Sequence, residues 1–337
     1  MSVDLPILPL PLEEIAADGI ELIRAFREAG SVGFSDVPLD QSRVKYEASC
    51  AANGIPREAV LHVEDLLCPV DGGSIRLRHY QPLVTDTPEA QRPVVLFLHG
   101  GGWVLGSVET HDHLCRRLAA VSRIDVVSAD YRLAPEYPFP VPLQDSRAAL
   151  RFVRDAATER GWDPRKIIVA GDSAGGNLAT VLATDPRLAV SGIAIIGQML
   201  LYPVTNLRDE SHSYSRIAEG FPLTAASMRW FRGLYLGDQD LASDLRASPG
   251  LRSKEDLARR NIPSTFLVTV GLDPLSAEGI AYAGLLASAG AAVEHHHLPR
   301  HYHGLFTSAG RIPTGAAFWD RAAEWARALE AQRMPFP

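Results

Sequence analysis

Short apolar runs of strand length alternate with longer helical patterns through most of the chain. The strand-like runs fall at residues 93–99, 125–131, 166–172, 192–204, 265–271 and 291–298. The helical patterns fall near 109–122, 141–158, from Ala174 onward, and near 276–289. Strands that alternate with helices favour a parallel sheet covered on both faces, and continuously apolar strands are typical of that burial. The pattern therefore predicts an α/β fold with a mostly parallel central sheet flanked by helices.

Two features precede this alternation. Residues 12–29 predict a helix that ends at Gly30 and lies outside the sheet. Its apolar face is formed by Ile15, Leu22, Ile23 and Phe26. Residues 59–80 predict a β-hairpin, because apolar and alternating segments flank the turn Asp71-Gly72-Gly73.

The alternation stops between residues 205 and 262. Residues 205–222 are polar and irregular, and Leu223–Leu236 reads as an amphipathic helix. This stretch is predicted to be an insertion that leaves the sheet and covers the site.

Composition narrows the class of protein. The chain has 337 residues, 46% hydrophobic and 22% charged, so it can bury a large core and is too apolar to be disordered. The 33 basic and 40 acidic residues give a net charge of −7, which disfavours nucleic acid as a partner. Cys50, Cys68 and Cys115 form no CxxC pair, so no disulfide framework and no zinc or other metal site is predicted.

The sequence predicts neither a membrane-spanning segment nor a signal peptide. The most apolar stretch, 193–204, is about 12 residues long and contains Gln198, so it predicts a buried strand too short to span a bilayer. No arginine or lysine precedes Arg24 and three prolines fall in the first twelve residues, unlike a signal peptide. We expect a cytoplasmic protein.

Residues 171–175, Gly-Asp-Ser-Ala-Gly, form a G-x-S-x-G sequence at a predicted strand-to-helix turn. Small neighbours allow the strained backbone that exposes a serine hydroxyl at such a turn. The helix N-terminus behind it offers unpaired N–H groups and a positive dipole end, which suit a developing anion. The pattern predicts Ser173 as a nucleophile; the alternative is a helix-capping serine.

Residues 99–103, His-Gly-Gly-Gly-Trp, directly follow a predicted strand. Glycines allow close approach of the backbone to a ligand, so the loop suits an oxyanion hole made of N–H groups. A phosphate cradle is the alternative, because Gly100, Gly102, Gly106 and Asp130 approximate a dinucleotide site. The GxGxxxG spacing and the lack of a following lysine disfavour that reading, and a purely structural turn is the third possibility.

A serine nucleophile needs a base, and the imidazole needs an acid that holds its tautomer. Asp273 follows the predicted strand 265–271, at the carboxyl end where ligand sites of open α/β sheets gather. The alternative role of Asp273 is a helix cap. The order serine, aspartate, histidine along the chain matches that of the α/β-hydrolases.

Five histidines between residues 295 and 303 compete for the role of base. Those at 295–297 lie in a predicted strand and alternate between its faces. This segment is interpreted as an edge or interface strand, and the alternative is a metal-binding histidine tract. His301 follows Arg300 and is predicted to face solvent. His303 is the predicted base, because it lies beyond the strand and Gly304 gives its loop backbone freedom.

Several independent sequences give the chain a family resemblance. It resembles the bacterial hormone-sensitive-lipase-like (family IV) esterases, a branch of the α/β-hydrolases, from about residue 60 to 310. Two departures are Ser276-Ala277-Glu278-Gly279, where the family often has Arg-Asp-Glu-Gly, and Leu305, where it has Phe. The sequences that carry the resemblance are HGGGW (99–103), DYRLAPEYPFP (130–140), GDSAGGN (171–177), QMLLYP (198–203), GLDPL (271–275) and HGLF (303–306).

The resemblance implies roles for individual residues. Ser173 would be the nucleophile, with Asp273 and His303 as its partners. The N–H groups of Gly101, Gly102 and Ala174 would form the oxyanion hole. The implied division is an N-terminal part of a helical cap (1–50), a first catalytic part (51–204), a cap insertion (205–240) and a second catalytic part (241–337).

Polar and aromatic residues around these motifs could serve either the structure or the binding of substrate. The polar residues of the segment 130–140, together with His99, are interpreted mainly as a buried brace for the glycine loop. Four aromatic residues either belong to the core or line the acyl and alcohol pockets: Trp103, Phe221, Trp230 and Phe231.

The sequence therefore predicts a serine carboxylesterase that hydrolyses short- to medium-chain esters through an acyl-enzyme, with a small-molecule ester as partner and no cofactor. An amidase or lactonase with the same triad is one alternative. A binding protein on the hydrolase scaffold is another, which the presence of His303 disfavours. The resemblance also implies a homodimer, in which 291–298 is the paired edge strand.

Overall fold

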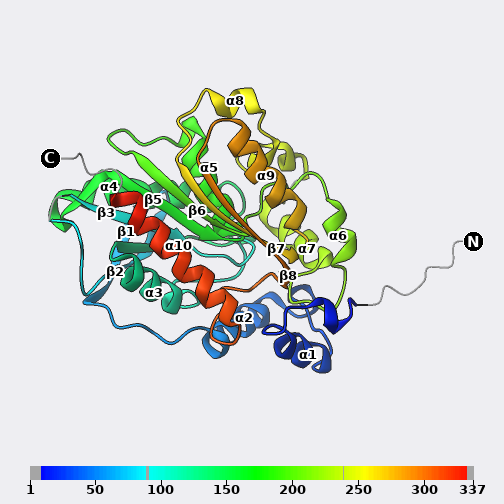
Figure 1. Ribbon diagram of the computed structural model, residues 1–337. Helices are drawn as coiled ribbons and strands as arrows, with labels where there is room; N and C mark the ends of the chain where they lie inside the picture. The colour runs from blue at the N-terminus through cyan, green and yellow to red at the C-terminus, as the bar shows by residue number, and fades with distance from the viewer. Residues whose placement is uncertain (1–8, 89–90, 238, 332–337) are drawn as a thin grey trace, which may run out of the picture.

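A computed structural model describes residues 9–88, 91–237 and 239–331 (Figure 1). Residues 1–8, which enter the expectation about a signal peptide, lie outside the described part.

The described residues form a single eight-stranded sheet with the order β1-β2-β4-β3-β5-β6-β7-β8. The β1–β2 and β2–β4 pairs are antiparallel, and all other neighbours are parallel. The predicted hairpin and the mostly parallel sheet are confirmed. The strands are β1 (His62–Val70), β2 (Gly73–Gln81), β3 (Arg92–Leu98), β4 (Asp125–Asp130), β5 (Trp162–Asp172), β6 (Ile195–Leu201), β7 (Ser264–Leu272) and β8 (Val293–Tyr302).

Helices cover both faces of the sheet, as its apolar strands require. On one face lie α3 (Asp112–Ser122) and α10 (Pro313–Ala331), and on the other α4 (Val141–Arg160), α5 (Ala174–Thr184) and α9 (Ser276–Ser288). Strand β3 shows the alternation directly: Val94 packs under α4 and α5, whereas Phe97 packs against α10. The apolar cores on the two faces of the sheet together fix the positions of the central strands and of their carboxyl ends.

Five further helices lie outside these layers: α1 (Ile20–Glu28), α2 (Leu39–Asn53), α6 (His212–Arg216), α7 (Ala225–Leu236) and α8 (Lys254–Ala258). The N-terminal helices contact the 212–236 segment, although the two are far apart in sequence (Figure 1). Arg27 Nε donates to the carbonyl oxygen of Gly220 at 3.1 Å. The rings of Phe34 and Phe231 lie 5.7 Å apart, centroid to centroid.

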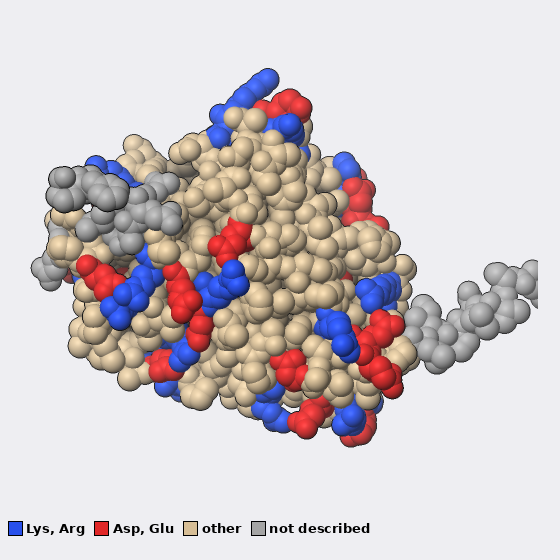
Figure 2. All heavy atoms as spheres, viewed as in Figure 1, with Lys and Arg blue, Asp and Glu red and all other residues tan. Residues whose placement is uncertain are grey.

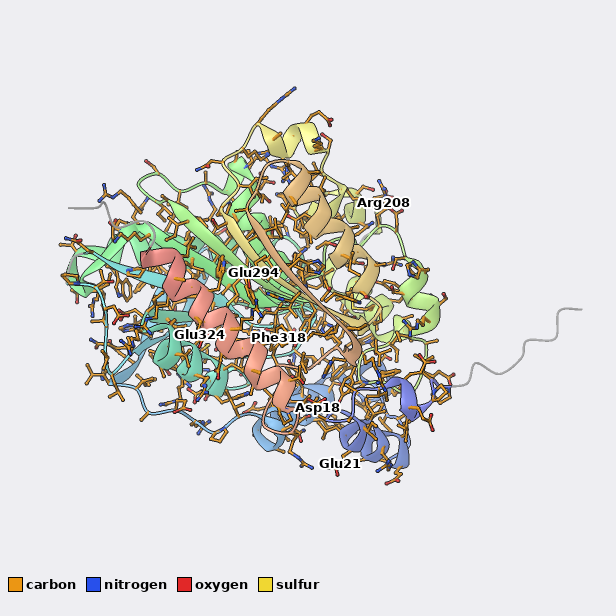
Figure 3. The ribbon with its side chains drawn as sticks, viewed as in Figure 1. Asp18, Glu21, Arg208, Glu294, Phe318 and Glu324 are labelled. Carbon is orange, nitrogen blue, oxygen red and sulfur yellow. The ribbon has the colours of Figure 1, made fainter. Side chains whose placement is uncertain are left out.

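The single helix predicted over 12–29 is wrong in its first half. A 3-10 turn at Leu12–Glu14 is followed by an irregular segment, and α1 begins only at Ile20. Asp18 interrupts the helix because its carboxylate accepts hydrogen bonds from Thr314 N at 3.1 Å and contacts His301 Nε2 at 3.1 Å. Figure 3 shows Asp18 beside the start of α10. Tertiary contacts override the local helical pattern here.

Four of the described helices carry no sequence prediction: α2, α6, α8 and α10. Helix α2 has Ser42 and Cys50 as its buried residues, so no apolar stripe marks it. Strand β8 occupies the predicted edge of the sheet but continues past residue 298 to Tyr302, so it includes His301.

Charges are interspersed on the face of the molecule that Figure 2 shows, with acidic and basic side chains next to one another over α10 and the N-terminal helices. This face offers no broad basic surface of the kind that a phosphate backbone requires. None of the helices in the described ranges has the length and apolar character needed to cross a bilayer.

Candidate active site

Ser173 lies at the turn between β5 and α5 with a strained backbone. Its φ of 54° and ψ of −118° are rare for a residue with a side chain. The flanking glycines explain how the turn fits: a Cβ at Gly175 would lie 1.9 Å from the carbonyl oxygen of Leu98, and one at Gly171 would lie 2.5 Å from it. The small residues of the G-x-S-x-G sequence are therefore a steric requirement.

Hydrogen bonds hold this turn in its strained form. Ser173 N donates to the carbonyl oxygen of Leu201 at 2.8 Å, and Val204 N donates to the carbonyl oxygen of Ser173 at 3.2 Å. The side-chain amide of Asn177 donates to Val204 O at 2.9 Å and to Ala247 O at 3.0 Å. The surrounding structure over-determines the position of the Ser173 hydroxyl.

His303 and Asp273 form a short hydrogen bond at the ends of β8 and β7. His303 Nδ1 and Asp273 Oδ2 are 2.7 Å apart, and Asp273 is fully buried. Since an ionised carboxylate only accepts, Nδ1 carries the proton and Nε2 is left as the basic nitrogen. Asp273 Oδ1 also accepts from Leu275 N at 2.9 Å, within the turn that precedes α9. The N-cap residue of α9 is Leu275, so Asp273 does not cap this helix.

The other histidines of this region face elsewhere. His295 Nε2 and His297 Nδ1 both contact Thr269 Oγ1 at 2.9 Å, whereas His296 Nε2 contacts Glu294 Oε1 at 2.8 Å, as the predicted alternation requires. His301 is not solvent-facing as predicted, because it is largely buried against Asp18. In the described ranges, no group of three metal-ligating side chains comes together.

The glycine loop after β3 has a backbone that only glycine adopts readily. Gly101 and Gly102 have φ values of +115° and +61°, and both line the same cavity as Ser173 and His303. Across the described chain, neither the N–H of Gly101 nor that of Gly102 donates to another residue. Ala174 is the first residue of α5, where a helix N–H has no partner within the helix.

Asp172 connects this loop to the turn that holds Ser173. Its Oδ1 accepts from Gly100 N at 2.8 Å, and His111 Nε2 lies 3.1 Å from the same oxygen. Burial favours the neutral carboxyl, but His111, His303 and the Gly100 amide outweigh it, so the pKa of Asp172 is lowered. The carboxylate is therefore an anionic anchor for the loop.

Aromatic and polar residues brace the loop from behind, as interpreted from the sequence. His99 stacks on Tyr131 with ring centroids 4.2 Å apart, and the Tyr131 hydroxyl donates to His99 O at 2.6 Å. Burial, with His111 nearby, lowers the pKa of His99 to about 4, so its ring is neutral. Asp130 accepts from Val108 N at 3.1 Å and pairs with Arg76 at 3.0 Å, which leaves it no role at a ribose.

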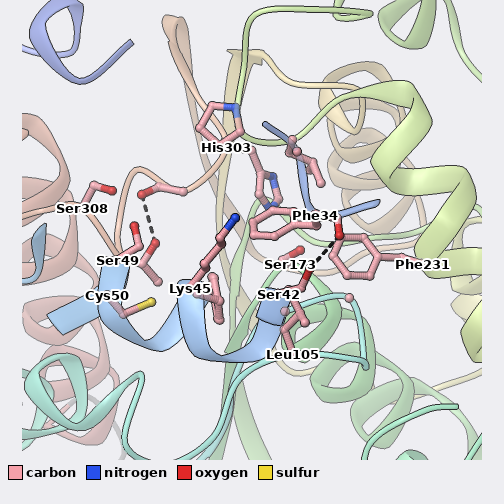
Figure 4. Close-up of a pocket in the computed structure, with 18 of the residues that line it drawn as sticks. Phe34, Ser42, Lys45, Ser49, Cys50, Leu105, Ser173, Phe231, His303 and Ser308 are labelled. Atoms are coloured by element: carbon pink, nitrogen blue, oxygen red, sulfur yellow. Dashed lines mark hydrogen bonds between the residues drawn. The ribbon is translucent and has the colours of Figure 1, made fainter. Parts of the chain in front are cut away.

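A cavity of about 240 Å³ contains the side chains of Ser173 and His303 (Figure 4). Of the four aromatic residues with two readings, the structure places Phe231 in the cavity wall. Trp103 is instead fully buried and stacks on Tyr235 at 4.1 Å, and Phe221 packs on Tyr302. Trp230 lies against Phe231 outside the lining.

Two parts of the site have no counterpart in the sequence predictions. The ring of Tyr202 lies 4.2 Å from that of His303 and helps to fix the imidazole plane. Helix α2 forms one wall of the cavity. Its lining residues repeat at helical spacing: Ser42, Lys45, Tyr46, Ser49 and Cys50. This helical spacing is visible in the sequence. Most of the residues that show it are polar, however, and an amphipathic helix is predicted from the spacing of apolar residues.

The sequence profile described as the alpha/beta hydrolase fold matches residues 95–307, more than half of the chain. The chain therefore belongs to the α/β-hydrolases, in the hormone-sensitive-lipase-like branch that the motifs indicated.

Relatives at the level of individual proteins have esterase names. Carboxylesterase NlhH of Mycobacterium tuberculosis is 38% identical over 324 residues, which cover 95% of this chain and 93% of that protein. Ethyl acetate hydrolase of Pseudomonas putida is 35% identical over 277 residues, which cover 82% of this chain and 86% of that protein. An ester hydrolase from the metagenome of Lake Arreo has a similar structure, with a TM-score of 0.85 and 36% identity. The match covers 93% of this chain and 98% of that chain.

Proposed function

We propose that the protein is a serine carboxylesterase that hydrolyses small carboxylic esters. One arrangement carries this proposal: Ser173, His303, Gly101 and Gly102 line one cavity, and Asp273 holds His303 at 2.7 Å. The N–H groups of the two glycines have no acceptor among the described residues, so they are free to donate to a substrate oxygen. A nucleophile, an oriented base and an oxyanion hole are the parts that acyl transfer needs. The names of the relatives support an ester as the substrate.

In the proposed mechanism, Ser173 Oγ attacks the ester carbonyl carbon while His303 Nε2 takes its proton. The carbonyl oxygen becomes an anion that the N–H groups of Gly101, Gly102 and Ala174 stabilise. Asp273 stabilises the imidazolium. His303 then gives the proton to the leaving alcohol oxygen, the carbon–oxygen bond of the ester breaks, and an acyl-Ser173 remains.

A water molecule completes the proposed cycle. His303 takes one proton from it as the oxygen attacks the acyl carbon. The bond to Ser173 Oγ then breaks, the proton passes to Oγ, and the carboxylic acid leaves. The arrangement regenerates the free enzyme with no group beyond these side chains and backbone amides.

We infer that residues 1–50 and 205–240 act as a cap over this cavity. Contacts between the N-terminal helices and α7 support it, as does the share of the wall that both contribute. A cavity of about 240 Å³ is below the usual range of about 300–1,000 Å³ for ligand pockets, so short to medium acyl chains of about 2–8 carbons are the proposed substrates.

We also propose a homodimer and a cytoplasmic location. Strand β8 ends the sheet and leaves one edge available for pairing, which supports the dimer. Sedimentation velocity tests it by the mass, which is either 36.6 kDa or twice that. The location is supported by Cys50, Cys68 and Cys115, which are all buried and unpaired, as in a reducing compartment.

Covalent labelling combined with a substrate panel tests the proposed activity. Diethyl 4-nitrophenyl phosphate should attach to wild type and not to Ser173→Ala, and wild type should hydrolyse butanoate esters much faster than the matched amides and lactones. Absence of labelling in wild type would favour a binding protein. Faster turnover of amides or lactones would favour the alternative hydrolases and overturn the carboxylesterase proposal.

A further inference from the structure

Helix α2 presents a cation to the cavity of the candidate active site. Ser42 lies three and four residues before Lys45 and Tyr46, and Ser49 lies four and three residues after them, so the four share one helical face. Figure 4 shows Lys45 reaching from this helix into the cavity that contains Ser173 and His303.

The positive charge of Lys45 has no ion-pair partner in the part of the chain that the structure describes. Over the described ranges, no carboxylate forms a salt bridge with its ammonium group. Arg43, two positions earlier on the same helix, is instead held by Glu136 at 2.7 Å. The acidic residue in the cavity wall, Asp172, is engaged by Gly100 N and His111. The cavity therefore has a lysine ammonium that forms no salt bridge with a described residue.

The two sides of the cavity differ in polarity. Apolar residues of the lining include Phe34, Leu105, Leu223 and Phe231, and Figure 4 shows Phe34 and Phe231 on one side of Lys45. Hydroxyl-bearing residues from α2 and from the loop after His303 are Ser49, Thr307 and Ser308, and Figure 4 shows Ser49 and Ser308 on the other side. In Figure 4, Lys45 lies between Ser49 and Ser308 on one side and Phe34 and Phe231 on the other.

The chemistry of the proposed reaction assigns the alcohol part of the ester to the polar side. His303 protonates the leaving oxygen, so that oxygen must come within hydrogen-bond reach of Nε2. Thr307 and Ser308 belong to the loop that begins at His303. The alcohol part therefore leaves along the hydroxyl-lined wall, past the Lys45 ammonium.

We propose that Lys45 is a specificity-determining residue that selects esters whose alcohol part carries a carboxylate, that is, esters of hydroxycarboxylic acids. The uncharged acyl chain occupies the apolar side. This inference rests on the proposed esterase function. An ammonium at the mouth of a cavity is partly hydrated, so the expected preference is moderate, about fivefold to tenfold.

Isosteric substrates test the proposal. The butanoyl ester of 4-hydroxybutanoate and that of 4-hydroxybutanamide differ in charge and hardly in shape. In wild type the ratio of kcat/KM, charged over neutral, should be about five to ten. It should fall to about one in Lys45→Met, fall below one in Lys45→Glu, and be kept in Lys45→Arg. The wild-type ratio should also decrease from 0.02 to 0.5 M salt as the charge is screened.

A matched control removes a lysine elsewhere. Lys254 lies exposed at the start of α8, outside the cavity, so Lys254→Met should keep the wild-type ratio. A second pair, monoethyl glutarate and ethyl 4-carbamoylbutanoate, carries the charge on the acyl part and should show little dependence on Lys45.

Three outcomes would overturn the inference. They are a wild-type ratio near one, a ratio unaffected by Lys45→Met, and a dependence on Lys45 confined to the acyl-side pair. Failure to hydrolyse even the neutral butanoyl ester would overturn the esterase proposal itself, so the two failures are distinguishable.

Discussion

The carboxylate of Asp172 accepts a hydrogen bond from the backbone N–H of Gly100 at 2.8 Å, across 72 positions of sequence. The contact is tight, because a Cβ at Gly100 would lie 2.3 Å from Asp172 Oδ2. It joins the loop that carries the proposed oxyanion hole to the turn that carries Ser173. The buried carboxylate of Asp172 thus helps to set the distance between Ser173 and the proposed N–H donors.

Removing that anchor should impair chemistry more than binding. We expect Asp172→Ala to lower kcat by about 10²-fold with a small change in KM, because the loop amides no longer point at the developing oxyanion. Steady-state kinetics on a butanoate ester measures this. Asp163→Ala is the control at the opposite end of β5, where the carboxylate pairs with exposed Arg165, and should stay within about twofold. An unchanged kcat in Asp172→Ala would show that the loop is held by other contacts.

The two histidines at the end of β8 should behave differently. His303→Ala should lower kcat by about 10³-fold or more, since it removes the proposed base and acid. His301 contacts Asp18 at 3.1 Å and lies outside the cavity lining, so His301→Ala should remain within about tenfold of wild type. Kinetics on the same ester decides between them; an inactive His301→Ala beside an active His303→Ala would contradict the assignment.

The glycines of the nucleophile turn should be irreplaceable for steric reasons. Gly175→Ala places a methyl group 1.9 Å from the backbone oxygen of Leu98, which cannot rotate away, so we expect a loss of about 3 kcal/mol or more of folding free energy. Gly284 in α9 has nothing within 4 Å of an added Cβ, and Gly284→Ala should stabilise the helix by about 0.5–1 kcal/mol. Denaturant unfolding of both variants measures the difference. Equal stabilities would argue against the close packing of this turn.

Phe231 should limit the acyl chain, unlike its neighbour. Its ring lies in the cavity wall against Gly102, where a Cβ would come within 2.3 Å of it. Phe231→Leu enlarges the cavity, so kcat/KM for octanoate relative to butanoate esters should rise several-fold. Trp230→Leu, outside the lining, should leave this ratio near the wild-type value. The reverse result would place the acyl chain on the other side of α7.

A buried carboxyl should make stability fall with pH. Burial raises the pKa of Glu278 to about 8, although Thr205 N at 2.7 Å and Asn206 N at 3.0 Å donate to it. The folded state therefore binds the proton more tightly than the unfolded state. This stabilisation is complete below about pH 4.5 and is lost as pH rises to about 8, at up to about 1.4 kcal/mol per pH unit. Thermal unfolding between pH 5 and 8 should show this decline in wild type and a weaker one in Glu278→Gln; parallel curves would contradict it.

The sequence predicted what local rules determine. Ser173 could be singled out because a strand, a turn and a helix follow one another within a few residues. Strand alternation set aside the histidines at 295–297, whereas His301 was set aside for a solvent exposure that the structure contradicts. Trp103 could not be placed, because its ring direction depends on Tyr235, which stacks on it from α7. Helix α2 escaped prediction because its polar side chains face the cavity and solvent, and no apolar periodicity remains.

The position of α2 in the chain has a consequence for how relatives diverge. The proposed catalytic residues all fall within 95–307, the range that the family profile matches, whereas α2 spans Leu39–Asn53 and lies before it. A substitution in α2 can therefore change the cavity wall without replacing any proposed catalytic residue. Two descendants of one ancestor can keep every motif and yet consume different metabolites, so transferring a substrate from one to the other requires comparing their first fifty residues rather than their triads.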